Sequence, residues 1–111
     1  MATLTLSLKR KWFDMIKSGE KKEEYREIKP YYESRFYKTF ISGFGTCEPE
    51  AGHRFKGFGE LVFTLGYPKT DDTERRLVFK NPKIRIGTGK PEWGAEPGKQ
   101  YFVITWEDDH V

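Results

Sequence analysis

The sequence predicts a small α+β protein in which a curled, mostly antiparallel sheet of about six strands forms a barrel covered by two helices. The 111-residue length suits one domain, so we expect a single domain over residues 1–111. Aromatic residues make up 16% of the chain and supply bulky core material. The last β-prone run, Tyr101–Trp106, has apolar or aromatic residues on both faces, which indicates a central strand.

The N-terminal third is predicted to form strand, helix, strand and helix. Strict alternation over Thr3–Leu8 puts leucines on one face, as in a half-buried strand. The next apolar residues fit one side of a short helix that ends at Gly19. Glu23–Ile28 is predicted to be a strand, and Pro30 opens a second helix reaching about Ile41, because proline is tolerated in a first helical turn.

The rest of the chain is predicted to hold a long loop and four strands. The segment 42–59 contains five glycines and a proline and exceeds the usual connection length, which is typical of a functional loop or a flexible insertion. Short β-prone runs separated by turn clusters follow it: Glu60–Leu65, Arg75–Lys80, Lys83–Ile86 and Tyr101–Trp106.

Composition limits the function classes. No apolar run approaches the ~20 residues of a membrane span and no secretory signal is visible, so we expect a cytoplasmic protein without a membrane partner. The single cysteine, Cys47, and the histidines His53 and His110 do not have metal-ligand spacing, so neither a metal nor another cofactor is expected. Residues 1–38 hold ten Lys or Arg against six Asp or Glu, a basic excess compatible with a phosphate-bearing partner.

A dense group of charges lies where the first helix stops and the second strand begins. Residues 19–26 contain six charged side chains in eight positions, which is unfavourable unless water or a partner reaches them. In a regular strand Lys22, Glu24 and Arg26 share a face, with Glu24 and Arg26 about 7 Å apart. Tyr25 is then expected to point the other way, into or against the helices.

The chemistry of this group favours binding. Lys21 lies in the turn after Gly19, where strand alternation does not fix its direction, so it can join Glu24 and Arg26. A carboxylate held between two cations can accept hydrogen bonds from a nucleobase, while the cations meet phosphate. Catalysis would need Lys21 to be desolvated enough to lose its proton, a shift that Glu24 opposes. The alternative is an exposed strand edge with opposite charges.

The spacing Gly19-x-Lys21-x-x-Glu24-x-Arg26, after an alternating strand and a short helix, resembles the motif of ASCH domains (activating signal cointegrator homology) in the PUA-like superfamily. The resemblance to small stand-alone bacterial and phage members covers nearly the whole chain, with residues 42–59 the most divergent. The downstream segments that carry it are Leu65–Tyr67, Ile84–Gly87, Pro91–Ala95 and Tyr101–Ile104.

The resemblance implies a small barrel with the motif in a cleft that binds or processes RNA. Some relatives are amidohydrolases that deacetylate N4-acetylcytidine, and others are reported as ribonucleases. In the amidohydrolases a threonine stands where this chain has Glu24, beside the lysine matching Lys21, and a distant glutamate completes the set. Glu60 and Glu74 are the candidates for that glutamate here, and Lys21 and Glu24 are the candidate catalytic residues.

Three functions remain open from the sequence. The first is an RNA- or nucleotide-binding module, the second a hydrolase of modified nucleosides or RNA with Lys21 as base, and the third a protein-interaction adaptor. Tyr67 and Trp93 are expected either to stack on a base or to cap one end of the barrel. The candidate ligand-binding residues are Gly19, Lys21, Lys22, Glu24, Arg26, Tyr67 and Trp93.

Overall fold

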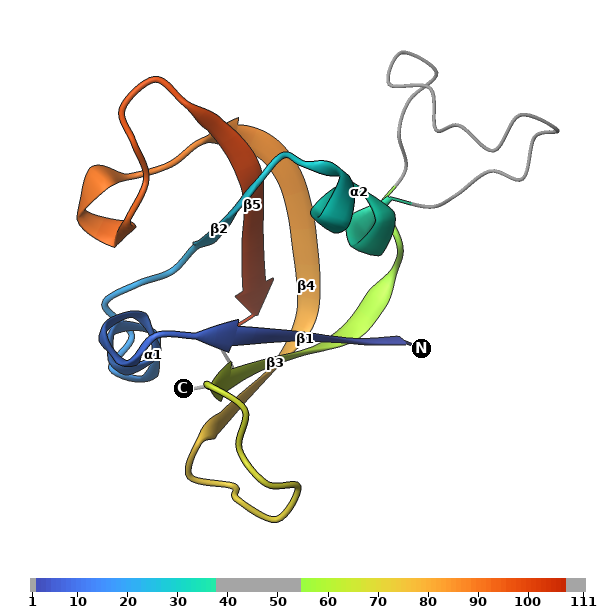
Figure 1. Ribbon diagram of the computed structural model, residues 1–111, viewed down its shortest axis with the longest axis vertical. Coiled ribbons are helices and arrows are strands. Elements are labelled where there is room, and N and C mark those ends of the chain that lie inside the picture. The colour runs from blue at the N-terminus through green and yellow to red at the C-terminus, as the bar shows by residue number, and fades with distance from the viewer. Residues whose placement is uncertain (1, 38–54, 108–111) are drawn as a thin grey trace, which may run out of the picture.

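The computed structural model describes residues 2–37 and 55–107, which form an α+β fold around one curled, mixed sheet (Figure 1). The order of strands across the sheet is β1-β3-β4-β5-β2, so β1 and β2 are its two edges. The elements in chain order are β1 (Ala2–Leu8), α1 (Arg10–Lys17), β2 (Glu24–Glu27), α2 (Pro30–Phe36), β3 (Phe58–Leu65), β4 (Arg76–Thr88), the 3₁₀ helix η2 (Pro91–Trp93) and β5 (Gln100–Glu107).

The first strand and first helix form as the sequence predicts. In β1 the three leucines are buried and Thr3 and Thr5 are exposed. Helix α1 buries Phe13 and Ile16, and Gly19 then takes the left-handed conformation, with φ of 85°. That conformation is easy for glycine alone, so it ends the helix and turns the chain toward β2.

Five strands stand where six were expected, because two predicted strands are one. The predicted runs Arg75–Lys80 and Lys83–Ile86 are continuous in β4. Asn81 has φ of 51°, a left-handed conformation that asparagine tolerates, and the register against β5 shifts between Lys80 and Lys83. Asn81 and Pro82 therefore make a bulge that bends one long strand instead of a turn between two.

Strand β5 lies between β4 and β2, and its residues 101–104 are all buried, which confirms the prediction of an interior strand apolar on both faces. Both of its pairings are antiparallel, as is β3 with β4. Strand β1 pairs with β3 in parallel, so the sheet is mixed. Figure 1 shows how the sheet curls, with α1 beside the end of β1 and α2 following β2.

Helix α2 is shorter than its predicted extent. It ends at Phe36, and Tyr37 is extended, bridges to Phe55 and stacks on the Phe55 ring at 5.2 Å. Leaving the helix at this point buries Tyr37 against Phe102, with ring centroids 5.4 Å apart. The predicted helix end and most of the predicted long loop lie outside the described residues, together with Cys47, His53 and His110.

No helix among residues 2–37 and 55–107 is long and apolar enough to span a membrane.

Candidate functional site

The turn between α1 and β2 brings Lys21 to Glu24. After Gly19 the chain folds back, and the Lys21 backbone N–H donates to the Met15 carbonyl at 3.0 Å. Strand β2 starts at Glu24, so Lys21 precedes the strand. The alternation of side chains along β2 therefore does not fix the direction of the Lys21 side chain. The ammonium of Lys21 then donates to Glu24 Oε1 at 2.6 Å.

Arg26 completes a buried charge triad, by which we mean Lys21, Glu24 and Arg26. One Nη of Arg26 donates to Glu24 Oε2 at 2.8 Å, so each carboxylate oxygen has a cationic partner. The side chains are 1% (Lys21), 7% (Glu24) and 14% (Arg26) exposed. The convergence expected from the motif spacing is therefore present, and it lies inside the molecule, not on an exposed strand edge.

Arg26 also joins the two edges of the sheet. The Nη that contacts Glu24 donates to the Ser7 carbonyl of β1 at 2.7 Å, and the other Nη donates to the Tyr32 hydroxyl at 3.1 Å. Strands β1 and β2 are the free edges of the sheet, and this guanidinium links them where backbone pairing does not. Arg26 thus binds Glu24 within the triad and also connects strand β1 to strand β2.

Aromatic rings surround the ammonium of Lys21. It lies 4.6 Å from the centroid of the Trp12 ring and 5.8 Å from that of Tyr25. Burial lowers the pKa of Lys21 below its usual value, and the ion pair with Glu24 offsets only part of that effect. For Arg26, burial disfavours the charge, but Glu24 and Tyr32 outweigh it and raise the pKa of the guanidinium.

The triad lies at a pocket of about 480 Å³, which we call the motif pocket. Trp12, Tyr32 and Trp93 contribute aromatic walls from α1, α2 and η2. Basic side chains outnumber acidic ones in the lining. Beyond the triad, the charged residues are Lys9, Glu27, Lys29, Glu96 and Lys99.

The other predicted ligand-binding residues separate into three places. Trp93 lines the motif pocket. Gly19 and Lys22 line a different hollow beside α1, because Lys22 precedes β2 and does not share a face with Glu24. Tyr67 lines a third pocket, which Arg26 also lines, and it lies outside the motif pocket.

Tyr25 lines the motif pocket together with Glu24 and Arg26. Its hydroxyl donates to Glu23 at 2.8 Å and accepts from the Lys90 N–H at 3.0 Å, and its ring packs on Tyr101 at 5.8 Å. The Gly89 backbone approaches so closely that a Cβ there would lie 2.6 Å from the Tyr25 ring. Burial raises the pKa of Tyr25 to about 12.

Two carboxylates besides Glu24 line the motif pocket, and the sequence singled out neither of them. Glu60 pairs with Lys80 in the sheet and Glu74 is exposed, and neither lines the pocket. Glu96 and Glu27 do line it. Glu96 directly follows the Pro91–Ala95 segment that carries the resemblance. This adjacency is the sequence feature that could have pointed to Glu96.

The walls contributed by Trp12 and Tyr32 were also missed as site residues. Both were assigned to helices, where an aromatic residue usually packs in the core. Each lies against a cation of the triad, Trp12 beside Lys21 and Tyr32 beside Arg26. The described part of the chain, 2–37 and 55–107, contains no cluster of three His, Cys, Asp or Glu side chains that could hold a metal ion.

Comparison of the chain with protein-family models, with curated proteins and with solved structures finds no match.

Proposed function

We propose that the protein is an ASCH-like, RNA- or nucleotide-binding domain that holds one nucleotide unit in the motif pocket. The observation that carries the proposal is the Glu24 carboxylate fixed between Lys21 and Arg26 at a pocket with aromatic walls. Hydrogen bonds from both cations fix the positions of the two carboxylate oxygens. A fixed acceptor beside aromatic rings is suited to the amino edge of a base.

The size and charge of the pocket support a nucleotide. Its volume of about 480 Å³ lies within the roughly 300–1,000 Å³ usual for small-molecule sites. Trp93 and Tyr32 line it, and aromatic side chains are the groups on which bases stack. Lys9, Lys29 and Lys99 lie around them and would meet a phosphate.

The test is a fluorescence titration of short single-stranded RNA and of nucleoside monophosphates at several salt concentrations. The double variant Lys29→Ala/Lys99→Ala should weaken RNA binding and lower its salt dependence, by a slope of about 0.7 for each phosphate that the protein no longer neutralises. Lys83→Ala is the matched control, because Lys83 is an exposed lysine outside the motif pocket. The absence of salt-sensitive binding to any nucleic acid or nucleotide would contradict the proposal.

The lowered pKa of Lys21 favours a second candidate, hydrolysis of an acylated nucleoside. Here Lys21, after losing its proton, accepts a proton from a water held by Glu24 while that water attacks the acyl carbon. The C–N bond breaks, the proton passes to the leaving amine, and the carboxylic acid and free nucleoside leave. Mass spectrometry after incubation with N4-acetylcytidine tests this, and turnover unchanged by Lys21→Ala would exclude it.

A further inference from the structure

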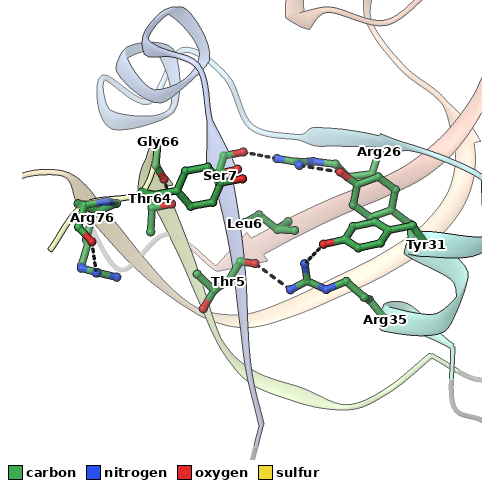
Figure 2. Close-up of a pocket in the computed structure, with 12 residues that line it drawn as sticks. Thr5, Leu6, Ser7, Arg26, Tyr31, Arg35, Thr64, Gly66 and Arg76 are labelled. Atoms are coloured by element: carbon green, nitrogen blue, oxygen red, sulfur yellow. Dashed lines mark hydrogen bonds between the residues drawn. The ribbon is translucent and has the colours of Figure 1, made fainter. Parts of the chain in front are cut away.

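A second basic pocket, of about 420 Å³, adjoins the motif pocket. We call it the arginine pocket, and none of the described residues that line it is an Asp or Glu. Figure 2 shows Arg26, Tyr31 and Arg35 on one side of β1 and Thr64, Gly66 and Arg76 on the other. Its charged and aromatic lining residues are Arg26, Tyr31, Tyr32, Arg35, Tyr67 and Arg76.

The arginines that belong to this pocket alone have neutral partners. Arg35 donates to the Tyr31 hydroxyl at 3.0 Å and to the Thr5 carbonyl at 3.1 Å. Arg76 donates from one Nη to two backbone carbonyls, of Pro68 and Lys69, at 3.4 and 3.3 Å. Among residues 2–37 and 55–107 no carboxylate lines the pocket, so none of these residues compensates the charges of Arg35 and Arg76 there.

Arg76 carries a further sign that an acceptor is missing. Its Nε is buried and has no hydrogen-bond partner, the one such side-chain atom found in the described part of the chain. A buried donor without an acceptor is unfavourable, and native structures contain few of them. An anionic oxygen in the pocket would compensate the charge of this guanidinium.

Tyr67 adds an aromatic surface to this pocket. Its side chain is on the connection between β3 and β4, which projects from the sheet (Figure 1), and the residue is 97% exposed. A fully exposed tyrosine adds little to the core, but its ring is available for stacking on a base. The pocket thus combines cations for phosphate with an open face for a base.

The two pockets share lining residues, so they lie side by side. Ser7, Arg26 and Tyr32 line both, so the hollows meet at the guanidinium that joins the two sheet edges. We propose that a single-stranded nucleic acid crosses both pockets, with one base in the motif pocket, its adjoining phosphate at the arginines and the next base on Tyr67. This inference rests on the proposed function and extends it from one nucleotide to a polynucleotide.

The test compares short labelled single-stranded RNA, DNA of the same sequence and nucleoside monophosphates on three variants. Tyr67→Ala should weaken binding of the RNA about tenfold, the usual effect of removing one stacking surface. Arg76→Ala should also weaken it and reduce the salt slope by about 0.7. Arg75→Ala is the matched control: it removes a neighbouring exposed arginine that is paired with Asp72 and lies outside both pockets.

The expected pattern is loss of oligonucleotide affinity in Tyr67→Ala and Arg76→Ala. Monophosphate affinity should be unchanged in Tyr67→Ala, because a monophosphate has no second base to stack on that ring. The DNA arm tells whether the 2′-hydroxyl contributes, and weakening of both polymers, or of RNA alone, supports the path. Oligonucleotide binding that both variants leave intact, while Lys29→Ala/Lys99→Ala lowers it, would overturn the inference and keep the proposed function. Complete absence of nucleotide binding would overturn both, and stronger competition by an acidic peptide than by RNA would assign the arginine pocket to a protein.

Discussion

The two pockets share Arg26 and Tyr32, yet they treat charge in opposite ways. In the motif pocket Glu24 forms ion pairs with two cations, and all three side chains are nearly buried. In the arginine pocket Arg35 and Arg76 contact neutral oxygens, and the described lining has no carboxylate. The motif pocket thus contains an ion-paired triad, whereas Arg35 and Arg76 contact neutral groups in the arginine pocket.

This difference shows how one small fold can use separate pockets to recognise a base and to attract a phosphate. Paired, buried charges are held in place, so they suit the reading of a base edge. Unpaired arginines attract any phosphate, so they supply affinity without selecting a sequence. Arg26 links the two, because the same guanidinium contacts Glu24 and the Ser7 carbonyl at the shared wall.

The largest expected effect is the loss of the carboxylate that pairs the charges. Glu24→Gln leaves Lys21 and Arg26 buried without their anion, and breaking a buried pair in this way costs about 3–5 kcal/mol of unfolding free energy. Chemical denaturation measures it. The control is Asp14→Asn, which breaks the exposed pair with Arg10 and should cost at most about 1 kcal/mol. Equal losses in the two variants would mean that the triad is not a buried unit.

A smaller loss is expected from filling the space beside Tyr25. In Gly89→Ala the new Cβ would lie 2.6 Å from the Tyr25 ring and 2.7 Å from the Ala95 Cβ. Forcing extra volume into a packed site costs about 1–3 kcal/mol, and the displaced ring should weaken nucleotide binding in the motif pocket. Gly57→Ala is matched, because its Cβ would meet nothing within 4 Å. A Gly89→Ala protein as stable as Gly57→Ala would contradict the close packing.

Lys21 makes stability depend on pH. Because burial lowers its pKa in the folded state, the unfolded chain binds the proton more strongly. The contribution of Lys21 to the free energy of unfolding therefore rises as the pH approaches the ordinary lysine pKa of 10.5. The slope is no more than about 1.4 kcal/mol per pH unit.

The measurement compares wild type with Lys21→Met in urea from near-neutral pH to about pH 10. Wild type should gain stability relative to the variant as the pH rises. Tyr25, whose pKa is raised to about 12, is present in both proteins, so its own titration cancels in the difference. A difference that is flat, or as small as that for Lys83→Met, would mean that the Lys21 ammonium is not penalised by burial.

Local features of the chain predicted local features of the fold. Alternation over residues 3–8 fixed the buried face of β1, and Gly19 fixed the end of α1, because both depend only on neighbouring residues. The short spacing of Lys21, Glu24 and Arg26 likewise limits where these side chains can go, so their meeting was predictable.

Features that depend on strand order were not predictable in this way. The parallel pairing of β1 with β3 joins segments about fifty residues apart, and it makes β1 and β2 the two sheet edges. The link from Arg26 to Ser7 and the wall formed by Tyr32 follow from those edges. The Asn81 bulge also needed the partner strand, because Asn-Pro alone favours a turn.

The smallest expected effect on stability is also the sharpest test of the comparison. Tyr67→Ala removes a ring that is 97% exposed, so the unfolding free energy should change by less than about 0.5 kcal/mol. Tyr101→Ala removes a buried ring and should cost about 3 kcal/mol or more. A large loss in Tyr67→Ala would mean that this ring packs on the fold after all. If Tyr67→Ala leaves the unfolding free energy unchanged and still weakens RNA binding, the ring contributes to binding the ligand and not to the stability of the fold.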